Sequence, residues 1–430
     1  MAIDRPSTFT SNVKIKTAPP LEKSVLRACS LMIKMGVRFA NQLSGMLRRH
    51  LRKAPRHTKQ MAYFTLMRPR LEYAAAVSGL HQQLAKMFKT KQHFIAIPPE
   101  YLHPLQRRSR TTNSVDRADM KRKVIIDTDP GTDDARAIIM ALAQPDWEIL
   151  AITLVAGNCK IKHQVDNIAR LLHICERTEI PVYKGSECSL LGNHDLQTGY
   201  HGVDGFGDVF TYDVDKSMVK EENAAIAIND LVQKYPGEVT LITIGPLTNV
   251  AMAIRLNPSL GSQLKDCFMM GGNIHGRGNR TTSAEFNFAC DPESAYIVLN
   301  ELKTTSPITI APLESCRISH LNWDVYERLN KIGSKKNNFT QQIDAYTAGE
   351  RRKAGERMIV YDECAVAAAI DVSTVEDSFE AYVTIELTGQ YTRGQCIVDY
   401  DKMLEKPPNC KVIVKMNQEK FEELIFQSLK

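Results

Sequence analysis

The stretch Asp127-Thr-Asp-Pro-Gly-Thr-Asp-Asp134 places four carboxylates within eight residues, directly after the apolar run Val124-Ile125-Ile126. The apolar run predicts a buried strand, Pro130-Gly131 predicts a turn, and Ala135 to Leu142 predicts a helix. The acids would then lie at the carboxyl end of a strand, which is where open α/β sheets bind ligands.

Four like charges at this spacing repel one another strongly, so a compact fold has to compensate them. A helix cap is one alternative, but it would use a single side chain, Thr132 or Asp133, and leave the other acids as solvated turn residues. A hard cation would compensate all four. Because no Cys or His lies among these carboxylates, calcium or magnesium is favoured over zinc.

This segment resembles the amino-terminal signature of the nucleoside hydrolases, the inosine-uridine-type N-ribohydrolases. Five further segments resemble motifs of that family in the same order: Val155-Ala-Gly-Asn158, Ile244-Gly-Pro-Leu-Thr-Asn249, Met269-Met-Gly-Gly272, Ala284-Glu-Phe-Asn287 and Val360-Tyr-Asp-Glu-Cys364. The resemblance runs from about residue 121 to the end of the chain. It implies a mainly parallel, open α/β sheet flanked by helices, as a catalytic domain over residues 121–430.

The resemblance also implies a calcium site and a ribose site. The implied calcium ligands are the carboxylates of Asp129, Asp134 and Asp362 and the backbone carbonyl of Ile244. Asp129 would in addition take a proton from the attacking water, and Asp127 would support the metal loop through hydrogen bonds without touching substrate. The residues implied to bind the ribose are Asp133, Asn158 and Asn287 at the 2′- and 3′-hydroxyls, Asn279 and Glu285 at the 5′-hydroxyl, and Met270 along the pocket wall.

The implied activity is hydrolysis of ribonucleosides to ribose and a free purine or pyrimidine base. Cleavage of an N-glycosidic bond passes through a ribosyl cation-like state, so it needs a water nucleophile, negative charge near the sugar and help for the departing base. A divalent ion lowers the pKa of bound water and attracts the ribose hydroxyls. Acid and amide side chains suit hydroxyl groups because they accept and exchange hydrogen bonds.

The chain departs from the family at the side of the leaving base. A histidine commonly precedes the last metal aspartate in the inosine-uridine type, whereas this chain has Tyr361, whose phenol of pKa ~10 is not poised near neutrality. His201, within Tyr200-His-Gly-Val-Asp-Gly-Phe-Gly207, matches a histidine of the family's base-side loop, and its glycine-rich flank suggests a lid. Tyr361 and His201 are therefore the candidate catalytic residues for the leaving group, and base preference stays open.

Two other functions are compatible with parts of the sequence. Asp127-x-Asp129 superficially resembles the paired aspartates of haloacid-dehalogenase-like phosphatases, but Gly131 occupies the position where that family has a threonine. A nucleoside-binding or calcium-binding protein of the same fold is the second alternative, because Tyr361 replaces the usual histidine. Such a protein would bind nucleosides without releasing the base.

Residues 1–120 differ in composition from the rest of the chain. They contain 22 Lys and Arg against 6 Asp and Glu, whereas the remainder contains 33 against 43. Lys59 to Tyr73 and Arg107 to Ser114 resemble the tail of reverse transcriptases of non-LTR retroelements. This resemblance implies a decayed fragment and not a working polymerase. The basic composition predicts a poorly ordered or partly helical extension that is not catalytic. A nucleic-acid-binding arm is a weaker alternative.

Composition fits a globular enzyme with a sizeable core, since 43% of the 430 residues are hydrophobic. No apolar run approaches the ~18 residues of a membrane span and the N-terminus lacks a signal-peptide core, so we expect no membrane partner and a cytoplasmic location.

The ten cysteines form no CxxC pair, which indicates reduced thiols. Cys267, Cys290 and Cys364 are interpreted as core residues. The family resemblance implies a homodimer or homotetramer.

Overall fold

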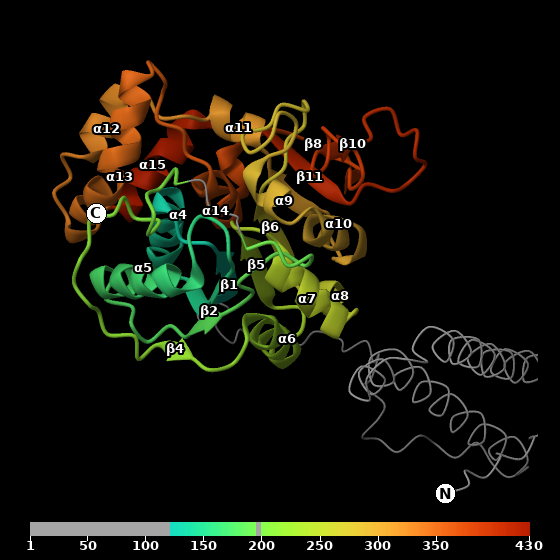
Figure 1. Ribbon diagram of the computed structural model, residues 1–430, viewed down its shortest axis with the longest axis horizontal. Helices are drawn as coiled ribbons and strands as arrows, with labels where there is room; N and C mark the ends of the chain where they lie inside the picture. The colour runs from blue at the N-terminus through green and yellow to red at the C-terminus, as the bar shows by residue number, and fades with distance from the viewer. Residues whose placement is uncertain (1–120, 195–198) are drawn as a thin grey trace, which may run out of the picture. The chain divides into compact units, whose positions relative to one another are not determined.

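A nine-stranded sheet with the strand order β4-β3-β2-β1-β5-β6-β7-β11-β8 forms the centre of the described domain (Figure 1). The structure is a computed structural model that describes residues 121–194 and 199–430. Neighbouring strands pair in parallel from β4 to β11, and the edge strand β8 runs antiparallel to β11. The predicted mainly parallel α/β sheet is confirmed. The predictions for residues 1–120 lie outside the described residues.

The strands are short and the helices alternate with them along the chain. The sheet comprises β1 Arg122–Thr128, β2 Trp147–Leu154, β3 Val182–Lys184, β4 Val219–Lys220, β5 Val239–Thr243, β6 Asp266–Met270, β7 Ile308–Ala311, β8 Val375–Ala381 and β11 Cys410–Met416. A separate antiparallel pair consists of β9 Val383–Ile385 and β10 Cys396–Val398.

Helices cover both faces of the sheet (Figure 1). On one face lie α4 Thr132–Leu142, α5 Ile161–Ile174, α12 Trp323–Leu329, α13 Lys335–Lys353, α14 Asp362–Ile370 and α15 Gln418–Ser428. On the other lie α6 Ala224–Lys234, α7 Thr248–Leu256, α8 Leu260–Gln263 and α10 Pro292–Glu301. The remaining short helices are α9 Phe286–Cys290, α11 Leu313–Ile318 and the 3-10 turn η4 Val372–Thr374. Within the described ranges, no helix combines the length and apolarity that crossing a membrane requires.

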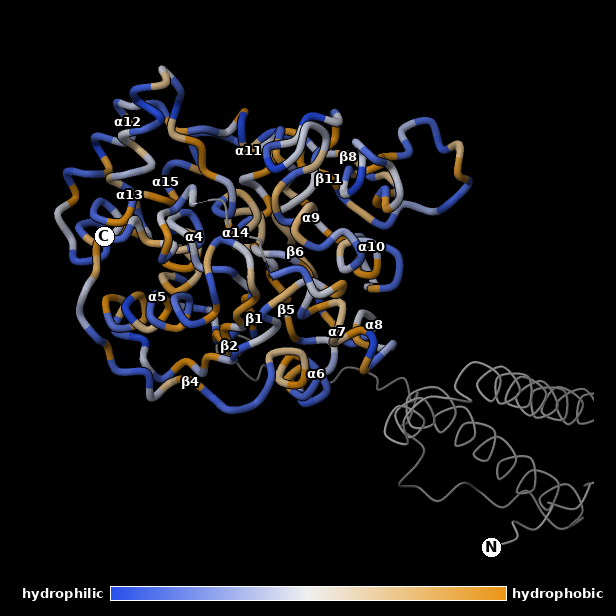
Figure 2. Tube along the Cα trace, viewed as in Figure 1, coloured by the Kyte–Doolittle hydropathy of each residue, from blue (hydrophilic) through white to orange (hydrophobic). Residues whose placement is uncertain are grey.

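Strand β1 shows why an uninterrupted apolar run forms the middle of this sheet. Val124 and Ile126 pack into the core beneath α4 and α5, whereas Ile125 packs into the core on the α6 and α7 side, and all three are fully buried. A strand that is buried on both faces has no polar side, because its side chains alternate between two cores. The hydrophobic colour in Figure 2 accordingly follows the central strands, and hydrophilic residues gather in the outer loops.

The alternating segment from Phe379 to Leu387 is not one continuous strand. The structure divides it at Tyr382 into β8 and β9. Asn409 explains the break: its Oδ1 accepts a hydrogen bond from Val383 N at 2.7 Å, and its Nδ2 donates to the Val383 carbonyl at 2.8 Å. These bonds replace the ladder of the main sheet, so the chain leaves that sheet and pairs with β10.

The order of the strands creates a crevice at the carboxyl ends of β1 and β5. From β1 the chain extends the sheet through β2, β3 and β4 in one direction, and then returns to add β5, β6 and β7 on the other side of β1. Ile244 N donates to the Asp127 carbonyl at 2.8 Å, and Val155 N donates to the Thr128 carbonyl at 3.0 Å. The loops after three neighbouring strands therefore leave the sheet together, at the position where such folds bind ligands.

Candidate active site

A cavity of about 1460 Å3 opens at this crevice, and most of the predicted site residues line it. The predicted residues along its wall are Asp133, Asn158, His201, Ile244, Met270, Asn279, Glu285, Asn287, Tyr361 and Asp362. Asp127, Asp129 and Asp134 lie beneath the wall and are fully buried. The structure thus gathers residues from position 127 to position 362 around one space.

Asp127 is a structural member of the acidic segment. Its Oδ1 accepts hydrogen bonds from Thr153 Oγ1 at 2.6 Å and from Asn249 Nδ2 at 2.8 Å. Burial raises the pKa of Asp127 to about 7. The carboxylate links β1 to β2 and to α7 through Oδ1, which is compatible with a supporting role, and its Oδ2 is buried without a hydrogen-bond partner among the described residues.

Asp134 fixes the turn that leads into α4. Its Oδ2 accepts hydrogen bonds from Gly131 N at 2.9 Å and from Asn158 Nδ2 at 3.2 Å, and its Oδ1 accepts a short bond from Thr128 Oγ1. Asp133 and Asp134 occupy the first turn of α4, where the helix dipole favours negative charge. The same carboxylate therefore closes the loop and belongs to the acidic cluster.

Asp129 lies between the loops that follow β2 and β5. Its Oδ2 accepts a hydrogen bond from Asn158 N at 2.7 Å, and its Oδ1 is buried without a hydrogen-bond partner among the described residues. Glycines allow both loops to lie this close to the Asp129 carboxylate, since a Cβ on Gly157 would lie 2.0 Å from Oδ2 and one on Gly245 would lie 2.7 Å from Oδ1. An unpartnered buried carboxylate oxygen is costly unless a ligand or cation uses it.

Three carboxylates, those of Asp133, Asp134 and Asp362, offer ligand oxygens within 4.8 Å of one another. Asp362 occupies the first turn of α14, so the amino-terminal ends of two helices meet at this cluster. Asp129 is not within that tight group, although its charge interacts with Asp134 and Asp133. A buried aspartate cluster of this kind could bind a metal ion.

The pKa values of these acids show how unfavourable their charges are without a counter-ion. Burial and the charge of Asp133 raise the pKa of Asp134 to about 7. Burial and the neighbouring Asp134 charge raise the pKa values of Asp129 and Asp362 well above the usual carboxyl range. A divalent cation would reverse these shifts, because it favours the ionised form of each acid.

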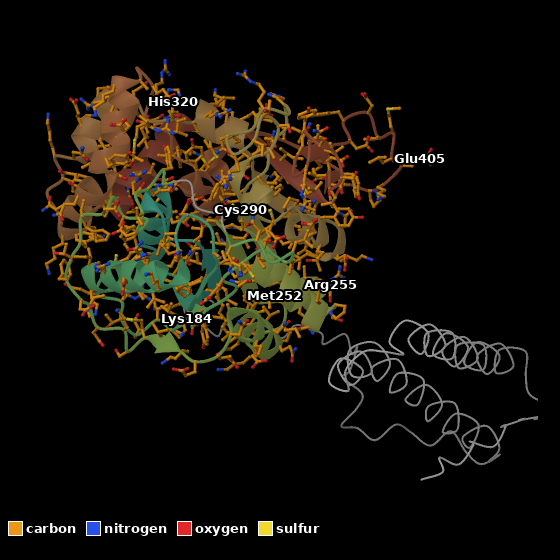
Figure 3. All side chains as sticks on the ribbon, in the orientation of Figure 1. Lys184, Met252, Arg255, Cys290, His320 and Glu405 are labelled. Atoms are coloured by element: carbon orange, nitrogen blue, oxygen red, sulfur yellow. The ribbon has the colours of Figure 1, made fainter. Side chains whose placement is uncertain are left out.

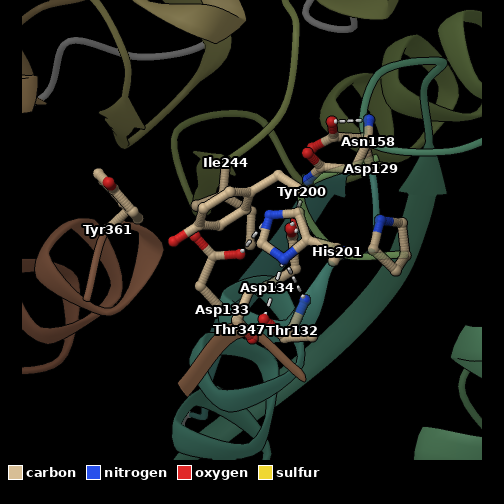
Figure 4. A network of polar contacts seen from close by, with 12 residues as sticks. Asp129, Thr132, Asp133, Asp134, Asn158, Tyr200, His201, Ile244, Thr347 and Tyr361 are labelled. Atoms are coloured by element: carbon tan, nitrogen blue, oxygen red, sulfur yellow. Dashed lines mark hydrogen bonds and ion pairs between the residues drawn. The ribbon is translucent and has the colours of Figure 1, made fainter. Parts of the chain in front are cut away.

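His201 is buried and packs over the beginning of α4 (Figure 4). Its Nδ1 accepts a hydrogen bond from Thr132 N at 3.3 Å and lies 2.9 Å from Thr132 Oγ1, and its Nε2 lies 3.5 Å from Asp133 Oδ1. Because Nδ1 accepts, the ring proton belongs on Nε2 and faces Asp133. Burial lowers the pKa of His201. In this arrangement the histidine faces Asp133 and not the opposite wall of the cavity, where Tyr361 lies.

The loop that carries His201 is packed onto the domain. Phe206 is fully buried and makes an edge-to-face contact with Phe339 of α13 at a centroid distance of 5.7 Å. Asn167 Nδ2 donates to the Asp204 carbonyl at 2.7 Å and to the Pro130 carbonyl at 3.3 Å. The glycine-rich segment that suggested a lid is therefore attached both to α13 and to the acidic loop.

Tyr361 belongs to a polar wall built around Arg351. Arg351 Nη2 donates to the Tyr361 phenol oxygen at 3.1 Å, and its Nε donates to the Tyr200 phenol oxygen at 2.7 Å. A further bond joins Arg351 Nη1 to Glu356 at 2.8 Å. Burial raises the pKa of Tyr361. Since the phenol oxygen of Tyr361 accepts from the guanidinium, its own proton can be donated toward the cavity.

The predicted ribose residues are connected by hydrogen bonds to the floor of the cavity. Asn287 Nδ2 lies 3.3 Å from the Ile244 carbonyl and 3.2 Å from the Met270 carbonyl. Glu285 caps α9, and its carboxylate accepts from Gly272 N, Asn287 N and Phe288 N at 2.8 to 3.2 Å. Asn279 is exposed at the rim.

Arg351 was not predicted from the sequence. It lies in the strongly polar helix α13, whose charged residues indicate a solvated surface. The signal that could have found it is the spacing of Asp344, Thr347 and Arg351, which places three polar residues on one face of the helix; all three are buried.

The family model for inosine-uridine preferring nucleoside hydrolases matches residues 124–423. An inosine-uridine preferring nucleoside hydrolase of Leishmania major is 35% identical over 314 residues, covering 72% of this chain and 98% of that protein. A non-specific ribonucleoside hydrolase RihC of Salmonella typhimurium is 32% identical over 304 residues, covering 70% and 95%.

Solved structures show the same relationship. An inosine-guanosine nucleoside hydrolase superposes with a TM-score of 0.67 at 35% identity, and the plant nucleoside hydrolase PpNRh1 with a TM-score of 0.66 at 28% identity. Each alignment covers 72% of this chain and 98% of the other.

The fold, together with these relatives, therefore identifies the protein as a hydrolase that acts on N-glycosyl bonds. The chain belongs to the inosine-uridine preferring nucleoside hydrolase family. The match begins at Val124, so the acidic segment and every predicted site residue fall within it.

Proposed function

We propose that this protein catalyses the calcium-dependent hydrolysis of ribonucleosides to ribose and a free purine or pyrimidine base. The observation that best supports the proposal is the meeting of the carboxylates of Asp133, Asp134 and Asp362 beside Asp129, at the floor of one large cavity. A set of oxygen donors without sulfur or imidazole suits a hard cation, and calcium tolerates an irregular shell.

Asp129, Asp134, Asp362 and the Ile244 carbonyl would hold the Ca2+ ion. The residues fit this group, because Oδ1 of Asp129 is a buried oxygen without a hydrogen-bond donor among the described residues. Bound Ca2+ would supply a Lewis acid that lowers the pKa of a water molecule and attracts ribose hydroxyls. Asp129 would accept the proton of the attacking water, since a carboxylate that has an open oxygen can act as a general base.

The ribose would lie against the cavity floor. Asp133, which His201 Nε2 faces at 3.5 Å, would accept hydrogen bonds from the 2′- and 3′-hydroxyls. Asn158 and Asn287 would complete this contact, and Met270 would pack beside the ring. Asn279 and Glu285 would bind the 5′-hydroxyl at the other end. The carboxylates near the sugar would also stabilise the positive charge that develops as the glycosidic bond lengthens.

The leaving base would face Tyr361. Arg351 donates to the phenol oxygen, which leaves the phenol hydrogen available to the departing base, and the guanidinium partly offsets the burial that raises the pKa of Tyr361. His201 faces Asp133 and Thr132, so its contribution in this arrangement is to the sugar side of the reaction. Tyr361 is therefore the residue to which we assign assistance of the base.

The test is ribose release from inosine, uridine, adenosine and cytidine by the purified full chain, with and without EGTA. Asp129→Ala should abolish release, while the matched variant Asp324→Ala, which removes an exposed acid in α12, should retain it. Release that needs both calcium and Asp129 supports the proposal. Binding of calcium and nucleoside without release of any base would instead indicate a binding protein, and release that persists in EGTA would exclude the calcium requirement.

We also propose, from family resemblance, that the protein is a homodimer or homotetramer that binds a small-molecule nucleoside. The sequence pattern, which contains no membrane span or signal-peptide core, is the basis for proposing that it acts in the cytoplasm. Sedimentation equilibrium of the full chain would test the assembly, and a mass equal to a single chain would contradict it. Localisation of a tagged chain by microscopy would test the compartment.

A further inference from the structure

A buried ion cluster lies directly behind the acidic site. Arg136 of α4 donates from Nε to Glu363 Oε1 at 2.7 Å, and from Nη1 to Asp344 Oδ2 through a short bond. The side chains of Arg136, Glu363 and Asp344 are 4%, 0% and 2% exposed. One guanidinium therefore joins three helices, since Glu363 belongs to α14 and Asp344 to α13.

The two ends of this cluster adjoin the residues of the proposed cation site. Arg136 follows Asp134 by two positions in α4, and Glu363 follows Asp362 directly in α14. The acids of the cation site come from the first turns of these same two helices. Any change in the spacing between α4 and α14 would consequently change the spacing between Asp134 and Asp362.

We propose that Arg136 is a positioning residue that holds α4 and α14 at the separation at which their carboxylates can share one divalent cation. This inference rests on the proposed function, because it concerns the same cation site. The fork of the guanidinium suits the task, because it can donate to two carboxylates from different nitrogens in a fixed geometry.

The charge balance behind the site supports this role. Arg136 compensates two buried carboxylates, and both Asp344 Oδ1 and Glu363 Oε2 lack a hydrogen-bond donor among the described residues. Without the arginine, two more buried negative charges would adjoin the acids of the cation site. Helices α4 and α14 would separate or admit water, because an uncompensated buried charge is strongly unfavourable. The cation ligands would then lose their common centre.

The experiment is a titration of the full chain with Ca2+ alone, in which isothermal calorimetry measures the calcium affinity. Arg136→Met should lower the calcium affinity by about tenfold or more, the range typical of residues that orient metal ligands. Arg136→Lys should lose less, because the ammonium keeps the charge but cannot donate through two separate nitrogens. The matched control is Arg255→Met, which breaks an exposed pair with Glu301 on the opposite face of the sheet and should leave the affinity unchanged (Figure 3).

A second variant keeps the inference testable if Arg136→Met does not fold. The combination Arg136→Met, Asp344→Asn and Glu363→Gln removes all three charges while keeping the shapes, which proteins often tolerate. It should fold and still bind calcium more weakly than the wild type. Wild-type affinity in either folded variant would overturn the inference, as would failure of both to fold, which would assign the cluster to folding alone. Absence of calcium binding by the wild type would instead contradict the proposed cofactor.

Discussion

Replacing Gly157 by alanine probes the acidic site with a single methyl group. The added Cβ would lie 2.0 Å from Asp129 Oδ2 and 3.0 Å from Pro246 Cδ. Carbon and oxygen atoms that are not bonded approach to about 3.3 Å, so the carboxylate of Asp129 has to move by more than about 1 Å. That movement would break the 2.7 Å hydrogen bond from Asn158 N.

A displacement of about 1 Å in a catalytic group can lower the rate by about 100-fold, which corresponds to about 2.7 kcal/mol of transition-state stabilisation. The lost hydrogen bond to a charged group would lower the free energy of unfolding by about 1.5 to 3 kcal/mol. We therefore expect Gly157→Ala to reduce kcat/KM for inosine by about two orders of magnitude while the protein remains folded.

The assay is ribose release at saturating calcium, together with thermal unfolding of the same preparations. Gly349→Ala is the matched control, because Gly349 lies within α13 and a Cβ there would meet no atom within 4 Å. The control should keep full activity and gain slight stability from its higher helix propensity. Activity of Gly157→Ala within about threefold of the wild type would refute the assignment of Asp129 to the reacting water.

Three further outcomes follow from the site. Tyr361→Phe and Arg351→Met should slow hydrolysis of inosine by about 100-fold but leave 4-nitrophenyl riboside, whose leaving group needs no proton, nearly unaffected; equal losses on both substrates would exclude assistance of the base. Burial raises the pKa of Glu285 to about 7, so the stability from this group is present below its unfolded pKa of about 4.3 and is lost as the pH rises through about 7. Urea unfolding of Glu285→Gln should therefore show a smaller fall in stability over that range than the wild type, and an identical pH profile would contradict the shift. Calcium at 100 times its Kd should raise the free energy of unfolding by about 2.7 kcal/mol, seen as a higher Tm that EGTA reverses, and an unchanged Tm would exclude binding.

The sequence predicted the part of the fold that depends on local pattern. The apolar run before Asp127 and the helix after it became β1 and α4. These elements are predictable because a strand buried on both faces has an uninterrupted apolar run, and a helix has apolar residues at helical spacing. The division of the strand at Tyr382 was not predictable in the same way, because it depends on the side chain of Asn409.

The site was predictable as a set of acids and amides, but their mutual geometry was not. The sequence associated Asp129, Asp134 and Asp362 through the family resemblance, whereas the structure places Asp133 in the tightest carboxylate group. Contacts such as those of Arg351 and Arg136 join segments that are distant in the chain, and no local pattern records which partner a buried arginine has. The pairing of charged residues that are distant in the chain is therefore the part of the site that only the three-dimensional structure reveals.

The assembly of the cavity from residues 127 to 362 has a consequence for how the chain folds. Most of its strand pairs are parallel and join segments that are distant in the chain, and such topologies fold slowly because long loops have to close before their contacts form. The first carboxylates are translated well before the helix that carries Asp362, so a nascent chain has only part of the proposed cation site. Calcium affinity would then rise late in folding, and a calcium-dependent signal during refolding would time the docking of α14 onto α4.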